Sequence, residues 1–271
     1  MNALLSTLMP KLPIGGPRVA VLEMYGPLGP VIRGQEYGRT ISALAQDPRI
    51  RSVVLDIDSP GGSATVADTI YRSLRHLSAR KPTVAYIRGA GLSGGYLMAC
   101  GAAKIVALPT SLVGSIGVIL MRPVVEELMQ RVGVQMVITK EGHLKDMFQP
   151  FRAPTDEEQA KLQALTGEMY EWFVDAVATS RGLDAEVVRG YATGEMYSAT
   201  KGKEMGLVDE LGDWDAALDM ACEMGRTPRR LHYVRPRRPL LERLLARGGA
   251  SMANAVMAEL ESRLSPRLEF R

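Results

Sequence analysis

The sequence predicts an α/β fold in which helices pack outside a mostly parallel sheet. Short runs of β-branched residues bounded by glycine or proline alternate with stretches whose apolar residues lie three and four positions apart. Alternation of strand and helix favours a parallel sheet, because each helix carries the chain back across it. The 271 residues, 46% of them hydrophobic, suffice for one large domain with its own core.

The predicted elements follow one another without an internal repeat. Strands are predicted over 18–26, 52–58, 83–88, 104–108 and 135–139. Amphipathic helices are predicted between them, over 33–46, 65–80 and 122–132. The longest helix is expected to begin after Thr155, which can form a capping box with Glu158, and to end at Gly182. Three shorter helices are expected around 184–191, 199–205 and 213–224.

Composition divides the chain into an N-terminal segment (1–16), a folded domain (17–225) and a tail (226–271). The tail holds eleven arginines, no lysine and four glutamates, a net charge of +7. Such an arginine-rich amphipathic stretch could contact anionic lipid or an acidic partner, and it fits a solvated helix face equally well. With 6% aromatic residues and no basic residues interleaved with them, binding of nucleic acid is not expected.

No transmembrane helix or signal peptide is predicted. No run of about eighteen apolar residues occurs, and the apolar start of the chain has no basic residues before it. The two cysteines, Cys100 and Cys222, lie far apart and read as small apolar residues in a reducing compartment. A cytoplasmic protein is therefore expected, peripheral at the inner face of the membrane if the tail binds lipid.

Residues 89–100, GAGLSGGYLMAC, place Ser93 among four glycines where a predicted strand gives way to a helix. Residues 91–95 match the G-x-S-x-G pattern of a nucleophile elbow. Small neighbours permit a strained turn that exposes the hydroxyl, and the helix start directs free N–H groups to the same place. Alone, the pattern also fits a phosphate-binding turn or tight packing.

A serine hydroxyl needs a base to remove its proton. Of the three histidines, His76 lies in a helical surface pattern, His143 in a polar loop and His232 in the basic tail. A Ser-Asp-His triad that uses His143 or His232 is formally possible.

A lysine can also act as the base if its amine is neutral. Lys140 and Lys145 both lie in KEGHLKDMFQPF, which follows the last predicted strand. Burial and nearby positive charge lower the pKa of a lysine, whereas a carboxylate raises it. Spacing alone does not choose between the two lysines.

The segment DSPGG, residues 58–62, ends another predicted strand. Parallel sheets place their sites at the carboxyl ends of their strands. Gly61 and Gly62 could bring backbone N–H groups close to a substrate carbonyl, which is what an oxyanion hole requires. Read alone, the segment fits a tight turn into a helix equally well.

Five segments together resemble the signal peptide peptidase A family, also called protease IV, in family order. They are VLDIDSPGG, YIRGAGLSGGYLMAC, IVALPTSLVGSIGVI, EGHLKDMFQPFR and GEMYSATKGKEMGLVDELG, within about residues 17–220. The family consists of serine-lysine peptidases. The resemblance therefore implies a ClpP/crotonase-like superhelix of repeated β-β-α units, with a mostly parallel sheet and outer helices.

The resemblance also implies a role for each matching residue. Ser93 would be the nucleophile, Lys145 the general base, and Ser115 the residue that hydrogen-bonds the lysine amine. The backbone N–H groups of Gly62 and Gly94 would form the oxyanion hole.

Lys145 occupies the lysine position of the family's K-D segment, and Lys140 falls outside it. Asp146 follows directly, and a carboxylate pointed at the amine would keep the amine charged. We therefore predict that the Asp146 side chain points away from Lys145.

The resemblance implies an assembly and a substrate class as well. A chain with one copy of the domain would form a ring-like homo-oligomer in which neighbouring subunits share the Ser-Lys dyad. Its substrates would be hydrophobic peptides, such as cleaved signal peptides or membrane-derived segments. No metal ion or other cofactor is expected.

Three alternatives remain open from the sequence. A crotonase-like acyl-CoA enzyme would use the same oxyanion hole without a serine nucleophile. A protease of the stomatin-associated group would share the dyad. A catalytically inactive ring scaffold would keep the fold alone.

Overall fold

The computed structural model describes residues 16–236. The chain divides into two compact units, Met1–Val234 and Arg235–Arg271, and the described sheet belongs to the first. Of the predicted N-terminal segment (1–16), only residue 16 is described. Of the predicted tail (226–271), residues 226–236 are described and the rest lies outside the described residues.

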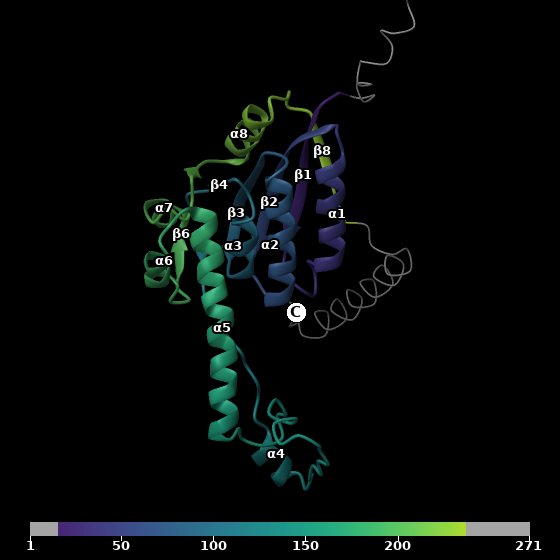
Figure 1. Cartoon of the computed structure of the whole chain (residues 1–271), viewed down its shortest axis with the longest axis vertical. Coiled ribbons are helices and arrows are strands. Elements are labelled where there is room, and N and C mark those ends of the chain that lie inside the picture. The colour runs from purple at the N-terminus through teal and green to yellow at the C-terminus, as the bar shows by residue number, and fades with distance from the viewer. Residues whose placement is uncertain (1–15, 237–271) are drawn as a thin grey trace, which may run out of the picture. The chain divides into compact units, whose positions relative to one another are not determined.

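An eight-stranded sheet forms the centre of the first unit (Figure 1). Its strands are β1 Arg18–Tyr25, β2 Ile50–Ser59, β3 Thr83–Leu92, β4 Lys104–Ala107, β5 Leu112–Gly114, β6 Met196–Ser198, β7 Glu210–Leu211 and β8 Leu231–Val234. The order is β6-β5-β3-β2-β1-β8, and β4 pairs with β3 and β7. The pairing is parallel throughout except between β5 and β6. The predicted α/β fold with a mostly parallel sheet is confirmed.

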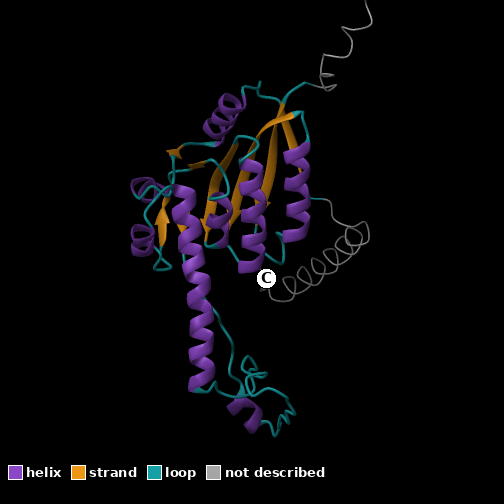
Figure 2. Ribbon diagram, viewed as in Figure 1, coloured by secondary structure: helices purple, strands orange, loops and turns teal. Residues whose placement is uncertain are grey.

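Helices cover both faces of the sheet (Figure 2). They are α1 Gly34–Gln46, α2 Ala64–Ser78, α3 Gly94–Ala99, α4 Glu126–Arg131, α5 Asp156–Arg181, α6 Ala185–Tyr191, α7 Ala199–Glu204 and α8 Trp214–Gly225. The larger apolar core lies between the sheet and the side that carries α1, α2, α3 and the C-terminal part of α5. A smaller core lies between the sheet and α8.

The central strand β2 shows why both faces are covered. Val53 and Leu55 belong to the larger core, and Val54 between them belongs to the smaller one. All three side chains are fully buried. A nearly continuous apolar run is what a parallel strand requires when it is buried on both faces.

Helix α5 is set by local signals at both ends. The Thr155 hydroxyl accepts the backbone N–H of Glu158 at 3.3 Å, and the Glu158 carboxylate accepts the backbone N–H of Thr155 at 2.9 Å. This capping box satisfies two N–H groups that the helix start would leave free. Gly182 ends the helix with a φ of 64°, in the left-handed conformation. The 26 residues between these ends form a rod about 39 Å long.

Two predictions from the sequence are wrong. Residues 135–139 form no strand and pair with none of the described strands; Val137 is 90% exposed. The domain boundary predicted at Gly225 falls too early, because β8 pairs in parallel with β1 and extends the sheet to Val234. The run over 135–139 has the composition of a strand without a partner, and composition cannot supply one.

Two glycines of α5 and its cap are expected to respond in opposite directions to alanine. Gly167 lies inside the helix, and a Cβ there meets nothing within 4 Å. Gly167→Ala should therefore stabilise the fold by about 0.5–1 kcal/mol through helix propensity. Gly182→Ala should destabilise it by about 1–2 kcal/mol, because an alanine at that φ is strained. Urea unfolding of both variants measures the difference, and equal signs would contradict this interpretation.

Candidate active site

Ser93 lies at the junction of β3 and α3 in a backbone conformation that only glycine adopts easily. Its φ is 52° and its ψ is −122°, and it is one of three described non-glycine residues with positive φ. Gly95, two residues further on, lies against β2: a Cβ on Gly95 would lie 2.5 Å from the carbonyl oxygen of Ser59. The glycines around Ser93 therefore allow the 58–62 turn to approach closely and hold the serine in a sharp turn.

The turn after β2 brings Gly61 and Gly62 to Ser93. A Cβ on Gly61 would lie 2.8 Å from the Ser93 Cβ and 3.0 Å from the Gly94 nitrogen. Gly62 has a φ of 140° and lies against Leu28, whose oxygen would be 2.5 Å from a Cβ there. Within the described part of the chain, the N–H groups of Gly62 and Gly94 donate to no protein acceptor. Two unused donors thus flank the serine.

Ser115 reaches the same place from a neighbouring strand. Leu92 and Gly114 are partners in the β3–β5 ladder, and the Ser93 N–H donates to the Gly114 carbonyl at 2.8 Å. Ser115 also has a positive φ, 50°, and its N–H donates to the Glu195 carbonyl at 2.7 Å. The structure therefore brings together four residues predicted from the sequence: Gly62, Ser93, Gly94 and Ser115.

A cleft of about 530 Å³ opens beside Ser93. Gly62, Ser93 and Gly94 lie in its lining. Six large apolar residues from α3, from the segment after β5 and from α5 form much of the rest: Leu97, Val118, Ile119, Met169, Trp172 and Phe173. The charged residues of the lining are Asp68 and Arg72 of α2 and Glu168 of α5. A cleft of this size and character can hold an apolar peptide side chain next to the serine.

Lys145 does not lie in this cleft. No residue between 120 and 167 lines it, and Lys145 is exposed. In Figure 1, α4 and the loops around it lie beside the N-terminal end of α5, beyond the sheet. The Lys145 side chain makes no hydrogen bond or ion pair with any residue that the structure describes.

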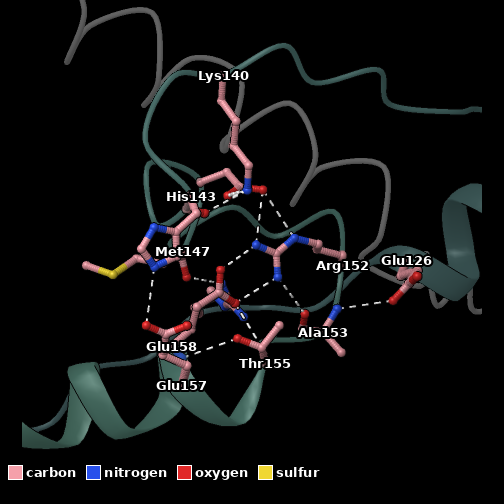
Figure 3. A network of polar contacts seen from close by, with 11 residues as sticks. Glu126, Lys140, His143, Met147, Arg152, Ala153, Thr155, Glu157 and Glu158 are labelled. Carbon is pink, nitrogen blue, oxygen red and sulfur yellow. Dashed lines mark hydrogen bonds and ion pairs between the residues drawn. The ribbon is translucent and has the colours of Figure 1, made fainter.

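The turn that carries Lys145 is held by a network of ion pairs (Figure 3). Asp146 accepts from the Arg152 Nε at 3.2 Å and pairs with Lys140. These cations hold the pKa of the Asp146 carboxyl below its ordinary value, with Lys140 the largest cause. The carboxylate is directed to Lys140 and Arg152 and forms no pair with Lys145 in the described chain, as predicted from the sequence.

Arg152 extends this network to α5. Its Nη1 donates to the Glu158 Oε2 at 2.7 Å, and its Nη2 also pairs with Glu158. Arg152 lowers the pKa of Glu158 to about 2. Sequence reasoning missed this link, although Arg152 ends one of the five matching segments and Glu158 was assigned to the capping box.

The three histidines lie outside the cleft. His76 is an exposed residue of α2, and His232 is exposed in β8. The His143 ring lies 3.3 Å from Glu157, and both side chains are exposed. None of the three lines the cleft beside Ser93.

The sequence model of peptidase family S49 matches residues 75–225, more than half of the chain. The chain belongs to peptidase family S49. Membership of S49 confirms the predicted signal peptide peptidase A family and, with it, the class of serine peptidase. A crotonase-like acyl-CoA enzyme and an inactive scaffold are not favoured.

Two curated relatives are similar over about two thirds of this chain. A putative protease of Methanocaldococcus jannaschii is 36% identical over 67% of the chain, and the match spans 58% of that protein. A putative signal peptide peptidase SppA of Enterococcus faecium is 31% identical over 68% of the chain and 54% of that protein. The chain thus matches little more than half the length of these relatives.

A solved structure shows the same fold. A mutant of the 1510-N membrane-bound stomatin-specific protease superposes with a TM-score of 0.52 at 16% identity, over 83% of this chain and 100% of that one. The predicted ClpP/crotonase-like architecture is confirmed at the level of the fold. Among the described residues, no helix has the length and apolar character needed to span a membrane.

Proposed function

We propose that this S49 chain is a serine endopeptidase that cleaves hydrophobic peptides with a Ser-Lys dyad, Ser93 and Lys145. One observation carries the proposal: Ser93 is held in a strained turn between two unused backbone donors, at the edge of an apolar cleft. Strain of this kind persists only where the surrounding fold imposes it, and it is typical of catalytic nucleophiles.

The chemistry follows from these groups. The neutral Lys145 amine takes the proton from the Ser93 hydroxyl, and the serine oxygen attacks the peptide carbonyl. The N–H groups of Gly62 and Gly94 hold the negative oxygen of the tetrahedral intermediate. The protonated lysine then gives its proton to the leaving amine, and water releases the acyl group by the same steps. Ser115, next to Gly114 in the strand beside Ser93, would hydrogen-bond the amine.

The ion pairs favour Lys145 over Lys140 as the base. Lys140 pairs with Asp146 and donates to the His143 carbonyl at 2.8 Å, so its amine is already engaged by two oxygens of its own segment. Lys145 carries no such pair among the described residues.

The position of Lys145 supports a dyad shared between two copies of the chain. Its turn is tied through Arg152 to Glu158, whereas Trp172 of the same helix lines the Ser93 cleft. The rise of an α-helix separates Glu158 and Trp172 by about 21 Å, far beyond the four-carbon stem of a lysine. A second copy would have to bring Lys145 to Ser93.

Exposed apolar side chains near α4 support the same assembly. They lie on either side of the helix and on it: Ile119, Leu120, Met121, Val124, Leu128, Val132, Val134, Met136, Val137 and Ile138. A concentration of exposed apolar residues in one short segment is typical of an interface with another chain. A ring-like homo-oligomer would cover this surface and supply the lysine.

Labelling with a fluorophosphonate tests the nucleophile. The intact chain should be labelled, and Ser93→Ala should reduce labelling to background because the reagent bonds to the activated oxygen. Ser63→Ala is the matched control: Ser63 lines the same cleft, and its hydroxyl lies 3.1 Å from the Thr65 hydroxyl. Unchanged labelling of Ser93→Ala would end the proposal.

A further inference from the structure

We propose that Arg152 is a positioning residue for Lys145: it holds the Asp146 carboxylate away from the lysine amine and fastens the lysine turn to α5. This inference rests on the proposed function of Lys145 as the base. It concerns how the amine of a lysine that precedes an aspartate in the sequence is kept clear of that carboxylate.

Asp146 is the nearest acidic neighbour of Lys145 along the chain, and its side chain is only 8% exposed. Arg152 approaches it with Nε at 3.2 Å and Nη2 at 3.0 Å. Lys140 pairs with the other carboxylate oxygen. Both oxygens of Asp146 are therefore occupied by cations other than Lys145.

The same guanidinium reaches a second buried carboxylate. Glu158 is 2% exposed and pairs with both terminal nitrogens of Arg152. Glu158 also completes the capping box by accepting the Thr155 N–H (Figure 3). Arg152 thus joins the lysine turn to the fixed first turn of a long helix. Only a planar guanidinium offers enough donors for two carboxylates at once.

Loss of Arg152 would change the charges around Lys145. Lys140 alone would remain to neutralise Asp146, and Glu158 would keep only its backbone donor. The Lys145 amine, which pairs with no described residue, is the adjacent group to which Asp146 could turn. A carboxylate at the amine stabilises its charged form and raises its pKa. The base would then be neutral only at higher pH.

The other charged and titratable groups around this turn do not offer the same function. They come from the turn, from the segment of α4 and from the start of α5: Arg122, Glu126, Lys140, Glu141, His143, Glu157 and Glu158. Arg122 donates to the Met147 carbonyl at 2.6 Å. Glu126 accepts the Ala153 N–H at 3.1 Å. His143 and Glu157 are exposed and pair with one another. Among the described residues, Arg152 alone joins Asp146 to α5.

The test is the pH dependence of kcat/KM for an apolar peptide substrate, measured on the full chain. The acidic limb of this profile reports the base of the free enzyme. Arg152→Gln should move the limb upward by about one pH unit, which is about a tenfold loss on its acidic side. Addition of Asp146→Asn should return the limb to its original pH even if kcat stays lower, because the freed carboxylate is gone.

Arg189→Gln is the matched control. Arg189 of α6 also bridges two glutamates, Glu186 of α6 and Glu171 of α5, and Glu171 lies far along α5 from the lysine turn. The acidic limb of the Arg189→Gln profile should stay at the pH of the intact protein. If Arg152→Gln does not fold, Arg152→Lys keeps one positive charge and should still raise the limb detectably. Asp146→Asn should again remove the rise.

A loss of activity with an unmoved limb in the Arg152 variants would overturn the inference and leave only a structural role. A limb that Asp146→Asn fails to restore would overturn it as well. Failure of the proposed function has a different result: Lys145→Ala would then keep fluorophosphonate labelling. If Lys145→Ala abolishes labelling but Arg152→Gln leaves the acidic limb unmoved, the proposed dyad stands. Only the positioning role of Arg152 is then wrong.

Discussion

A mixture of Ser93→Ala and Lys145→Ala chains is expected to regain about a quarter of the activity of the intact protein, although each variant alone is inactive. If two copies share the dyad, a site works when its serine comes from a Lys145→Ala chain and its lysine from a Ser93→Ala chain. In random assembly, each of the two positions at a contact holds the required variant in about half of the cases. About one contact in four is therefore active, because every contact in a ring is equivalent. Each single variant should lose about 10⁴-fold or more in kcat.

Co-expression of the two variants with different affinity tags provides the measurement. Tandem purification isolates mixed assemblies, whose peptidase rate is compared with that of the intact protein. A mixture of Ser93→Ala with the double variant Ser93→Ala/Lys145→Ala is the control and should stay inactive. Mixed assemblies that form but show no activity would contradict a shared dyad.

Gly62→Ala is expected to lower kcat by about 10²–10³-fold, the cost of losing one oxyanion donor. A Cβ at residue 62 would lie 2.5 Å from the backbone oxygen of Leu28, and its φ of 140° excludes an unstrained alanine. A backbone atom cannot move aside as a side-chain end can, so the peptide unit must rotate and take its N–H away from Ser93. The loss should fall on kcat more than on KM, because the donor acts on the transition state.

Gly206→Ala separates this effect from backbone strain. Gly206 also has a positive φ, 76°, but a Cβ there meets the end of the Leu183 side chain at 3.2 Å, away from the cleft. It should cost about 1–2 kcal/mol of stability and leave kcat unchanged for the folded fraction. A Gly62→Ala enzyme with a normal kcat would show that Gly62 is not a donor.

Much of the fold could be predicted because the decisive signals are local. The β-branched runs that became β1 to β4 lie between helix patterns, and Thr155, Glu158 and Gly182 mark both ends of α5. Strands that depend on a distant partner were missed or misplaced. β8 has four residues, two of them exposed, and is recognisable only through its pairing with β1. The run over 135–139 has strand composition but no partner.

The site was predictable in part for the same reason. The glycines around Ser93 indicate a tight strand-to-helix turn, and the resemblance to the signal peptide peptidase A family directed attention to Gly62, Ser115 and Lys145. The sequence could not show that the turn of Lys145 lies at the start of α5, far from the Ser93 cleft of the same chain. Nor could the sequence show that Arg152 pairs with both Asp146 and Glu158, because these two carboxylates meet only after the 140–152 segment has folded onto α5.

The left-handed backbone at Ser93 and Ser115 has a thermodynamic meaning. Each serine holds its conformation at a cost of about 1–2 kcal/mol that a glycine would not incur. A chain that only had to assemble into a ring would be more stable with glycine at both positions. Under the proposed mechanism, these two hydroxyl groups exchange local stability for reactivity. Variants selected for heat resistance alone should therefore lose these serines first.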